Sequence, residues 1–423
     1  MEKQKQNKEQ NKKPILQIIV NKILSSPNQT INNSSGFIES LISKNKKNLQ
    51  LFSENGLPDE IPILRSIVWK INLGYLPINN EEWENILSDK RSSYFYYKDI
   101  IQKKLLEEYK LFENYSNMSK EEKENLDKTT NKLLLEQICK DVNRTHNQMD
   151  FFFKPTDENN KLTKKELIEI MDNRRNCSMK DINDIYKINI KETHADVIAR
   201  ILFIYSTFFP DISYVQGMNE IIAPIYYVFS FDKTYGVENS VENIEADVFW
   251  TFNSLMNQIK DNFNHEKNQE KTGIGGRVQK FKKMLEIMDF QLYQHFEKFN
   301  VEYYTFAFRW FILFFSQEFL MIDILRLWDY LFSSDDKYFN CYFVSLAVLE
   351  LKRDDLLVSD LSGILSNLKS FKGLNVEEII SLSKKIKAQY GQTFLQVIIF
   401  NFKRLYYYNN KYICIIFVKC KCL

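Results

Sequence analysis

Two ionisable side chains stand three residues apart near the end of an apolar run, in the segment ICKDVNRT at 138–145. An arginine keeps its charge at any working pH, and its planar guanidinium can grip two oxygens of a carboxylate or a phosphate. On a helix, this spacing places Asp141 and Arg144 on one face, and the helix dipole favours positive charge near the carboxyl end. By physical reasoning alone, an intrahelical ion pair is the favoured interpretation.

A second polar group opens the apolar segment SYVQGMNEI at 213–221. Ser213 followed three residues later by Gln216 has the form of a capping box, which would use the glutamine to close the start of a helix. Gly217 has no side chain, so another backbone or a ligand could approach closely at that point. The sequence therefore leaves two roles open for Gln216: its side chain caps the helix, or it extends away from the helix toward another molecule.

A third group is the pair Arg65 and Trp69 in IPILRSIVWKINLGYLP. Their spacing of four residues places a guanidinium beside an indole on one helix face. The favoured interpretation is a structural cation–π contact.

Several common chemistries have no motif in this sequence. There is no GxxxxGK[ST] phosphate loop and no GxGxxG segment, so the chain is not expected to bind a nucleotide by itself in either common way. GIGG at 273–276 is interpreted as part of a loop without a preceding strand. The four histidines are too far apart for a metal-centred hydrolase, and no GxSxG elbow occurs. No cofactor of the chain's own is expected.

The composition indicates a folded, helical protein. Of 423 residues, 44% are apolar, and 57 basic residues nearly balance 55 acidic ones, which gives no general reason to expect nucleic-acid binding. Only 11 glycines and 8 prolines are too few for the many turns of a sandwich or barrel, so an all-α fold is favoured. The six cysteines lack zinc-site spacing and are interpreted as reduced thiols.

The polar groups are embedded in segments with helical periodicity. From Ala195 to Phe209 the apolar residues share one broad face, and Pro210 ends the helix. A second helix is expected to start after Ser213, with a kink at Pro224. A glycine-bearing loop is expected at 265–276. Further helical patterns occur at 245–260, 277–298, 303–320, 321–333, 339–352 and 376–402.

Three motifs occur in a fixed order along the chain: R-x-x-x-W, then I-x-x-D-x-x-R, then Y-x-Q-G. This set resembles the signature of TBC-domain Rab GTPase-activating proteins, and the stretch FAFRWFILFFSQEFLMIDILRLWD at 306–329 is similar to the family's late helices. The stretch at 200–229 is especially similar to one member of the TBC1 subfamily. The similarity runs from about Phe37 to Leu382.

The resemblance implies a role for each matched residue. Arg144 is implied as an arginine finger inserted into the nucleotide site of a partner, and Gln216 as a glutamine finger that orients the attacking water. The other matched residues are implied to support the site or hold the fold around it: Asp141, Arg65, Trp69, Tyr214 and Gly217.

The resemblance also implies the architecture and the partner. It implies an all-α TBC (Rab-GAP) domain at 37–402, of about fifteen helices in two helical subdomains, with an insertion at 155–185. The protein would be an enzyme activator, not an enzyme, because the hydrolytic site, the GTP and the Mg²⁺ belong to a GTP-bound Rab-family GTPase. The resemblance further implies a role in vesicle trafficking and a location in the cytoplasm, with transient presence at endomembranes. The alternatives are a catalytically silent Rab-binding scaffold and a purely structural helical adaptor.

The two ends of the chain fall outside this resemblance. Residues 1–13 form a polar tail without the apolar core of a signal peptide, and no transmembrane segment is expected. The tail at 403–423 has no assigned role. It ends in Cys420-Lys-Cys-Leu, which has the form of a prenylation motif but carries lysine at the first aliphatic position, so lipidation is not the favoured interpretation.

Overall fold

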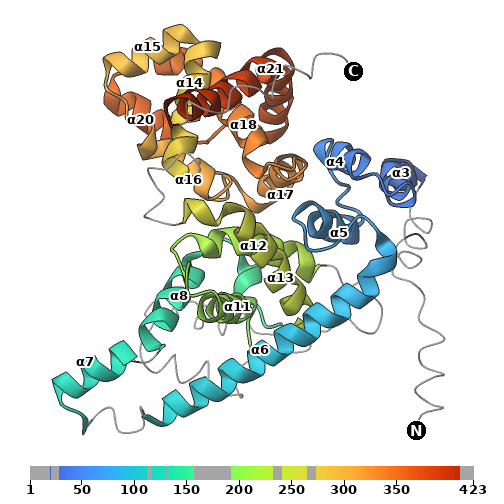
Figure 1. Ribbon diagram of the computed structural model, residues 1–423, viewed down its shortest axis with the longest axis vertical. Helices are drawn as coiled ribbons and strands as arrows, with labels where there is room; N and C mark the ends of the chain where they lie inside the picture. The colour runs from blue at the N-terminus through green and yellow to red at the C-terminus, as the bar shows by residue number, and fades with distance from the viewer. Residues whose placement is uncertain are drawn as a thin grey trace. The chain divides into compact units, whose positions relative to one another are not determined.

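The computed structural model describes residues 20, 28–111, 117–129, 131–156, 192–231, 241–263 and 273–409. Within these ranges the protein forms seventeen α-helices and no strand, and its extended chain pairs only at an isolated bridge between Pro155 and Thr193 (Figure 1). The predicted all-α class is confirmed. The tail at 1–13, almost all of the expected insertion at 155–185 and the end of the chain from residue 410, Cys420 included, lie outside the described residues.

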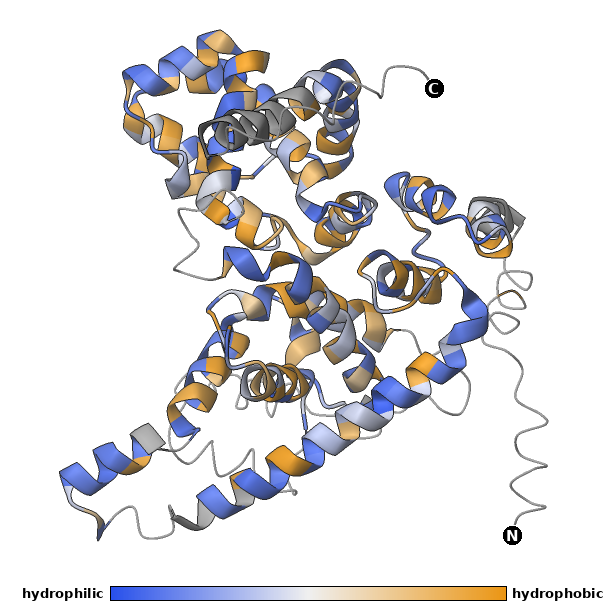
Figure 2. Ribbon diagram, in the orientation of Figure 1, coloured by the Kyte–Doolittle hydropathy of each residue, from blue (hydrophilic) through white to orange (hydrophobic). Residues whose placement is uncertain are grey.

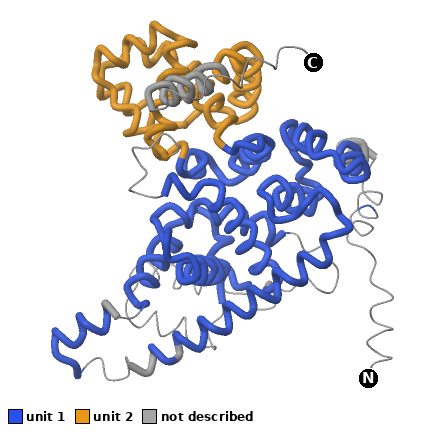
Figure 3. The backbone as a smooth tube through the Cα atoms, viewed as in Figure 1, with its two compact units in different colours: residues 1–268, 312–337 blue, residues 269–311, 338–423 orange. Residues whose placement is uncertain are grey.

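The chain divides into two compact units, as the expected two subdomains require (Figure 3). Residues 1–268 and 312–337 form unit 1, and residues 269–311 and 338–423 form unit 2. Unit 1 contains α3 (Asn28–Ile42), α4 (Lys46–Glu54), α5 (Pro62–Asn72), α6 (Trp83–Leu111), α7 (Lys120–Thr129), α8 (Lys132–Arg144), α11 (His194–Phe208), α12 (Met218–Ser230), α13 (Val241–Ile259) and α17 (Met321–Leu331).

Unit 2 is built from the later helices. They are α14 (Ile274–Met288), α15 (Phe290–Lys298), α16 (Tyr304–Ile312), α18 (Lys337–Leu351), α19 (Arg353–Val358), α20 (Leu361–Lys369) and α21 (Val376–Asn409), with the first residue of α18 and the last of α16 counted in unit 1. A cluster of aromatic rings around Phe281 and Trp310 fills its interior.

The core of unit 1 is formed by α11, α12 and α13, which pack against one another. α12 is apolar along most of its length, whereas α7 is hydrophilic (Figure 2). α11 has the predicted apolar face, with Val197, Ile201 and Leu202 buried. Its start is fixed by a capping box between Thr193 and Asp196.

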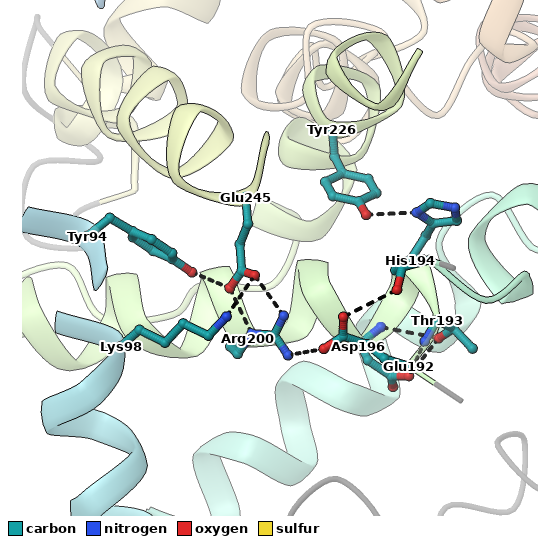
Figure 4. A network of polar contacts seen from close by, with 10 residues as sticks. Tyr94, Lys98, Glu192, Thr193, His194, Asp196, Arg200, Tyr226 and Glu245 are labelled. Carbon is teal, nitrogen blue, oxygen red and sulfur yellow. Dashed lines mark hydrogen bonds and ion pairs between the residues drawn. The ribbon is translucent and has the colours of Figure 1, made fainter. Parts of the chain in front are cut away.

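α13 carries two buried carboxylates that tie it to its neighbours. Glu245 accepts hydrogen bonds from Tyr94 (2.5 Å) and Lys98 (3.2 Å) on α6 and from Arg200 (2.7 Å) on α11 (Figure 4). Although burial favours its neutral form, Arg200 and Lys98 hold the pKa of Glu245 below its ordinary value. α13 is therefore joined to α6 and α11 by a buried charge network.

The second carboxylate, Asp247, connects α13 to α5 and α6. It accepts hydrogen bonds from Lys70 (2.9 Å), from Arg91 (2.9 and 2.8 Å) and from the Tyr75 hydroxyl (3.0 Å). Burial again opposes ionisation, and the pKa of Asp247 still lies below its ordinary value because Lys70 and Arg91 face it. Sequence reasoning missed both carboxylates.

Three predicted boundaries were wrong. α12 begins at Met218 rather than after Ser213, because Ser213 (φ 54°) and Gly217 (φ 106°) have left-handed backbone conformations that a helix cannot continue through. The expected helix at 277–298 is broken at Asp289, which caps α15, and begins earlier, since GIGG forms the start of α14 rather than a loop. The expected helix at 303–320 ends at Ile312, before Phe314 and Phe315, which also have positive φ.

Two further features bear on the expectations. No helix in the described ranges combines the length and apolarity needed to cross a bilayer. The buried Cys139 and Cys341 form no disulfide, and the other four cysteines lie outside the described residues.

Candidate functional site

Arg144 is the last residue of α8 and is largely exposed. The apolar residues Leu135, Ile138 and Val142 are buried where α8 packs against α11 and α12. The Arg144 side chain is 63% exposed, whereas the neighbouring Asp141 side chain is 3% exposed. The helix therefore presents a guanidinium to solvent with a buried carboxylate behind it.

The predicted ion pair between these two residues is present. One terminal nitrogen of Arg144 donates a hydrogen bond to Oδ1 of Asp141. This hydrogen bond raises the pKa of Arg144 above its ordinary value, so the side chain stays cationic. The pair holds the guanidinium in place without burying it.

Gln216 lies in the turn between α11 and α12, and its side chain is exposed. The capping box, one of the two interpretations that the sequence left open, does not form, because Gly217 is the residue that precedes α12 and it makes no side-chain cap. The Gln216 amide forms no hydrogen bond with a described side chain. Of the two interpretations left open by the sequence, outward reach is the one that the geometry supports.

Gly217 is required by the shape of this turn. Its φ of 106° is one that side-chain-bearing residues rarely adopt, and a Cβ at this position would lie 2.8 Å from Cδ2 of Leu313. The glycine thus permits both the backbone reversal before α12 and the close approach of the 313–320 segment.

Tyr214 joins the two halves of the site. Its buried hydroxyl donates a hydrogen bond of 2.8 Å to Oδ2 of Asp141, while Oδ1 of the same carboxylate holds Arg144. Burial and the nearby Asp141 charge both raise the pKa of Tyr214, so its hydroxyl stays protonated as a donor. Asp141 and Tyr214 therefore link the end of α8, which bears Arg144, to the turn that bears Gln216.

A second carboxyl lies behind the network. Burial raises the pKa of Glu220 to about 7, and a hydrogen bond with Gln317 and the charge of Arg144 only partly oppose this shift. His146 faces it, with 3.8 Å between Nε2 and Oε2, and burial lowers the pKa of His146 to about 4. Burial thus reduces the negative charge that Glu220 places near Arg144.

Arg65 and Trp69 do not belong to this network. Both donate to Asp329 on α17, Arg65 through Nε (3.1 Å) and a terminal nitrogen (3.0 Å) and Trp69 through Nε1 (2.8 Å). The predicted cation–π contact is wrong, because a fully buried carboxylate takes up both donors. The pair supports the fold by joining α5 to α17.

Sequence reasoning missed Asp329 and Glu220. It also missed Asn219 and Thr145, which are hydrogen-bonded to each other beside Asp141. Asn219 and Glu220 follow directly after Gln216-Gly217-Met218, and two polar residues at the start of an apolar helix were the available signal. Asp329 is the final residue of the 306–329 stretch, where its isolation among apolar residues indicated a buried partner.

The arrangement is suited to contacting an anionic group on another molecule. The exposed guanidinium of Arg144 is permanently charged, and the exposed amide of Gln216 lies on the adjoining turn. The side chains of Asp141 and Tyr214, which hold these two segments together, are buried. No cluster of three or more metal-ligating side chains occurs in the described part of the chain.

Comparisons with known proteins identify relatives of this chain. The sequence model of the Rab-GTPase-TBC domain matches residues 155–357, a range that includes Gln216 but not Arg144. Human TBC1 domain family member 13 is 33% identical over 378 residues, which cover 80% of this chain and 93% of that protein. This is the subfamily that the stretch at 200–229 predicted.

A yeast relative and a solved structure extend the comparison. The GTPase-activating protein GYP1 of Saccharomyces cerevisiae is 26% identical over 361 residues, which cover 81% of this chain and 46% of that protein. The crystal structure of the Ypt/Rab-GAP domain of Gyp1p shares the fold, with a TM-score of 0.61 at 23% identity over 86% of this chain and 99% of that chain. The chain belongs to the TBC-domain (Rab-GTPase-TBC) family.

Proposed function

We propose that this protein is a GTPase-activating protein for Rab-family small GTPases. The observation that carries the proposal is the network in which Asp141 and Tyr214 join an exposed Arg144 to the turn that bears an exposed Gln216. Relatives with this domain include one named as a GTPase-activating protein. GTP and Mg²⁺ are carried by the Rab partner, and this chain supplies no cofactor of its own.

Arg144 acts as an arginine finger. Small GTPases hydrolyse GTP slowly because they lack positive charge at the β- and γ-phosphate oxygens, where charge develops in a loose transition state. An arginine inserted in trans neutralises this charge and contributes roughly 10³- to 10⁵-fold in rate. At about 1.36 kcal/mol per tenfold, this is about 4–7 kcal/mol of transition-state stabilisation. Asp141 orients the guanidinium for this contact.

Gln216 acts as the second finger. Its amide can donate to a γ-phosphate oxygen and accept from the attacking water, which fixes the water for in-line attack. Tyr214 and Gly217 set the turn that holds it. The chain thus serves as an activator, with the bond-breaking site on its partner. It acts in the cytoplasm and transiently at endomembranes, in the control of vesicle trafficking.

Single-turnover GTP hydrolysis across a panel of GTP-loaded Rab proteins tests the proposal. Wild type is compared with Arg144→Ala and Gln216→Ala, and binding to each Rab is measured in parallel. We expect one or a few Rabs to respond and both variants to lose the acceleration while they still bind. If Rabs bind but none responds, the protein is a silent Rab-binding scaffold; if none binds, it is a structural adaptor.

A further inference from the structure

We infer that Asn219 is a positioning residue that fixes the two fingers relative to each other. The inference rests on the proposed function, since it concerns how Arg144 and Gln216 are held for one reaction. Asn219 lies in the first turn of α12, is 4% exposed, and touches both the end of α8 and the turn that bears Gln216.

The amide nitrogen of Asn219 reaches the end of α8. Nδ2 donates to Oγ1 of Thr145 at 2.6 Å and lies 3.3 Å from the backbone oxygen of Asp141. The Thr145 hydroxyl in turn donates to that same backbone oxygen at 3.0 Å. The side chain thus takes up a carbonyl of the last turn of α8, which has no partner within the helix.

The amide oxygen of Asn219 holds the turn on the other side. Oδ1 accepts the backbone N–H of Gly217 at 3.1 Å, directly after Gln216, and lies 3.1 Å from the Tyr214 hydroxyl. Because Gly217 makes no cap of its own, this hydrogen bond satisfies a donor at the mouth of α12 and fixes the left-handed turn. One side chain therefore sets the backbone on both sides of the site.

The contacts require a side chain that is both donor and acceptor. Nδ2 also lies 3.2 Å from Oε1 of Glu220, so each polar atom of the amide has a partner in a buried setting. Aspartate would lose the donors and add charge beside Asp141, and alanine would lose both groups. Only an amide of this length meets the geometry.

The rate of GTP hydrolysis should therefore depend on Asn219, although Asn219 itself does not contact the GTPase. Two groups from separate elements must be held to within a fraction of an ångström to stabilise one transition state, and a misplacement of about 1 Å can cost about 10²-fold. Ground-state binding to the GTPase depends on a far larger surface, so it should change little.

The test measures single-turnover hydrolysis by a responsive Rab with Asn219→Ala and Thr145→Val. Thr145→Val removes the hydroxyl that links Asn219 to α8 while it keeps the shape. Titration with Rab loaded with a non-hydrolysable GTP analogue gives the Kd and counts the binding-competent molecules, and each rate is normalised to that count. Asn253→Ala, at another buried asparagine of unit 1 (8% exposed), is the matched control.

We expect Asn219→Ala to lower the maximal rate per binding-competent molecule by about ten- to a hundredfold, with a Kd within about twofold of wild type. Thr145→Val should show a smaller loss of the same kind, and Asn253→Ala should show none. A merely structural role would reduce the number of competent molecules and leave their rate unchanged.

An unchanged normalised rate in Asn219→Ala overturns the inference. If that variant does not fold, Thr145→Val decides, and its full activity would also overturn it. Failure of the proposed function gives a different result, because the wild-type protein itself would then accelerate no Rab. In that case the inference about Asn219 is also wrong. If wild type and Asn219→Ala are equally active, only the inference about Asn219 is refuted, and the proposed function stands.

Discussion

Arg65 and Arg144 each pair with an aspartate in unit 1, yet their surroundings differ in almost every respect. Arg65 is 7% exposed and uses three nitrogens, with hydrogen bonds to Asp329, to Asp59 (2.5 Å) and to the backbone oxygen of Leu57 (3.0 Å). Arg144 is 63% exposed, and Asp141 holds it through a single terminal nitrogen.

The difference separates a structural arginine from one available to a partner. A guanidinium has five N–H donors, and those of Arg65 are turned toward acceptors of unit 1, namely the buried Asp329, the Leu57 carbonyl and the exposed Asp59, so its charge is already used within the fold. The remaining donors of Arg144 meet no acceptor among the described residues. Degree of donor saturation, rather than the presence of an ion pair, distinguishes the two roles.

Replacing each arginine by lysine should give the largest contrast. Arg144→Lys keeps the charge but loses the fork, so we expect loss of most of the roughly 10³- to 10⁵-fold that arginine fingers contribute, with stability within about 0.5 kcal/mol of wild type. Arg65→Lys should reverse this pattern, with a loss of about 2–4 kcal/mol in the free energy of unfolding and a normal rate per folded molecule. Single-turnover assays and urea unfolding measure the two effects. Equal loss of stability in both variants would contradict the comparison.

Asp329→Asn should give the next largest effect. It removes the charge that neutralises a buried guanidinium, and breaking a buried pair in this way costs about 3–5 kcal/mol. We expect the urea midpoint to fall accordingly. A variant as stable as wild type would show that the Arg65 cluster does not hold α5 to α17.

Gly217→Ala should disturb both stability and rate. The positive φ costs about 1–3 kcal/mol for a residue with a side chain, and the new Cβ would press on Leu313, so the turn that bears Gln216 must shift. Gly373→Ala is the matched control, because Gly373 has a similar φ of 84° but nothing within 4 Å of the added Cβ. We expect Gly373→Ala to lower the melting temperature without lowering the rate. Equal rates in the two variants would show that the turn geometry does not matter.

Glu220→Gln should be visible as a change in the pH dependence of stability. Because the folded pKa of about 7 lies above the ordinary value of 4.5, the unfolded chain releases this proton first as pH rises. The Glu220 contribution to stability therefore declines between about pH 4.5 and 7, by at most about 1.4 kcal/mol per pH unit. The buried His146, with its lowered pKa, acts in the opposite direction below pH 6.5.

Unfolding of wild type and Glu220→Gln should therefore be compared from pH 5 to 9. His146 is present in both proteins, so the part of its contribution that comes from burial cancels in the difference. We expect the stability of wild type relative to Glu220→Gln to fall across pH 5 to 7 and to become constant above pH 8. A difference that does not vary with pH would show that Glu220 is ionised throughout.

The sequence by itself determined the helical class, the apolar face of α11 and the identity of the residues matched to the family. Helical periodicity and the scarcity of glycine and proline are local properties, so they can be recognised without knowledge of distant contacts. The ion pair between Asp141 and Arg144 was predictable for the same reason, since both residues lie on one helix.

Only the tertiary structure decided which polar groups are saturated and which are free to act. Asp329 lies far along the chain from Arg65, and Asn219 bridges two segments that the sequence separates, so no local pattern indicated either contact. Whether Gln216 caps a helix or reaches outward depended on the left-handed turn at Gly217 and its packing against Leu313. Spacing along a chain predicts the faces of single helices, whereas the partners of buried polar groups are chosen by how helices pack.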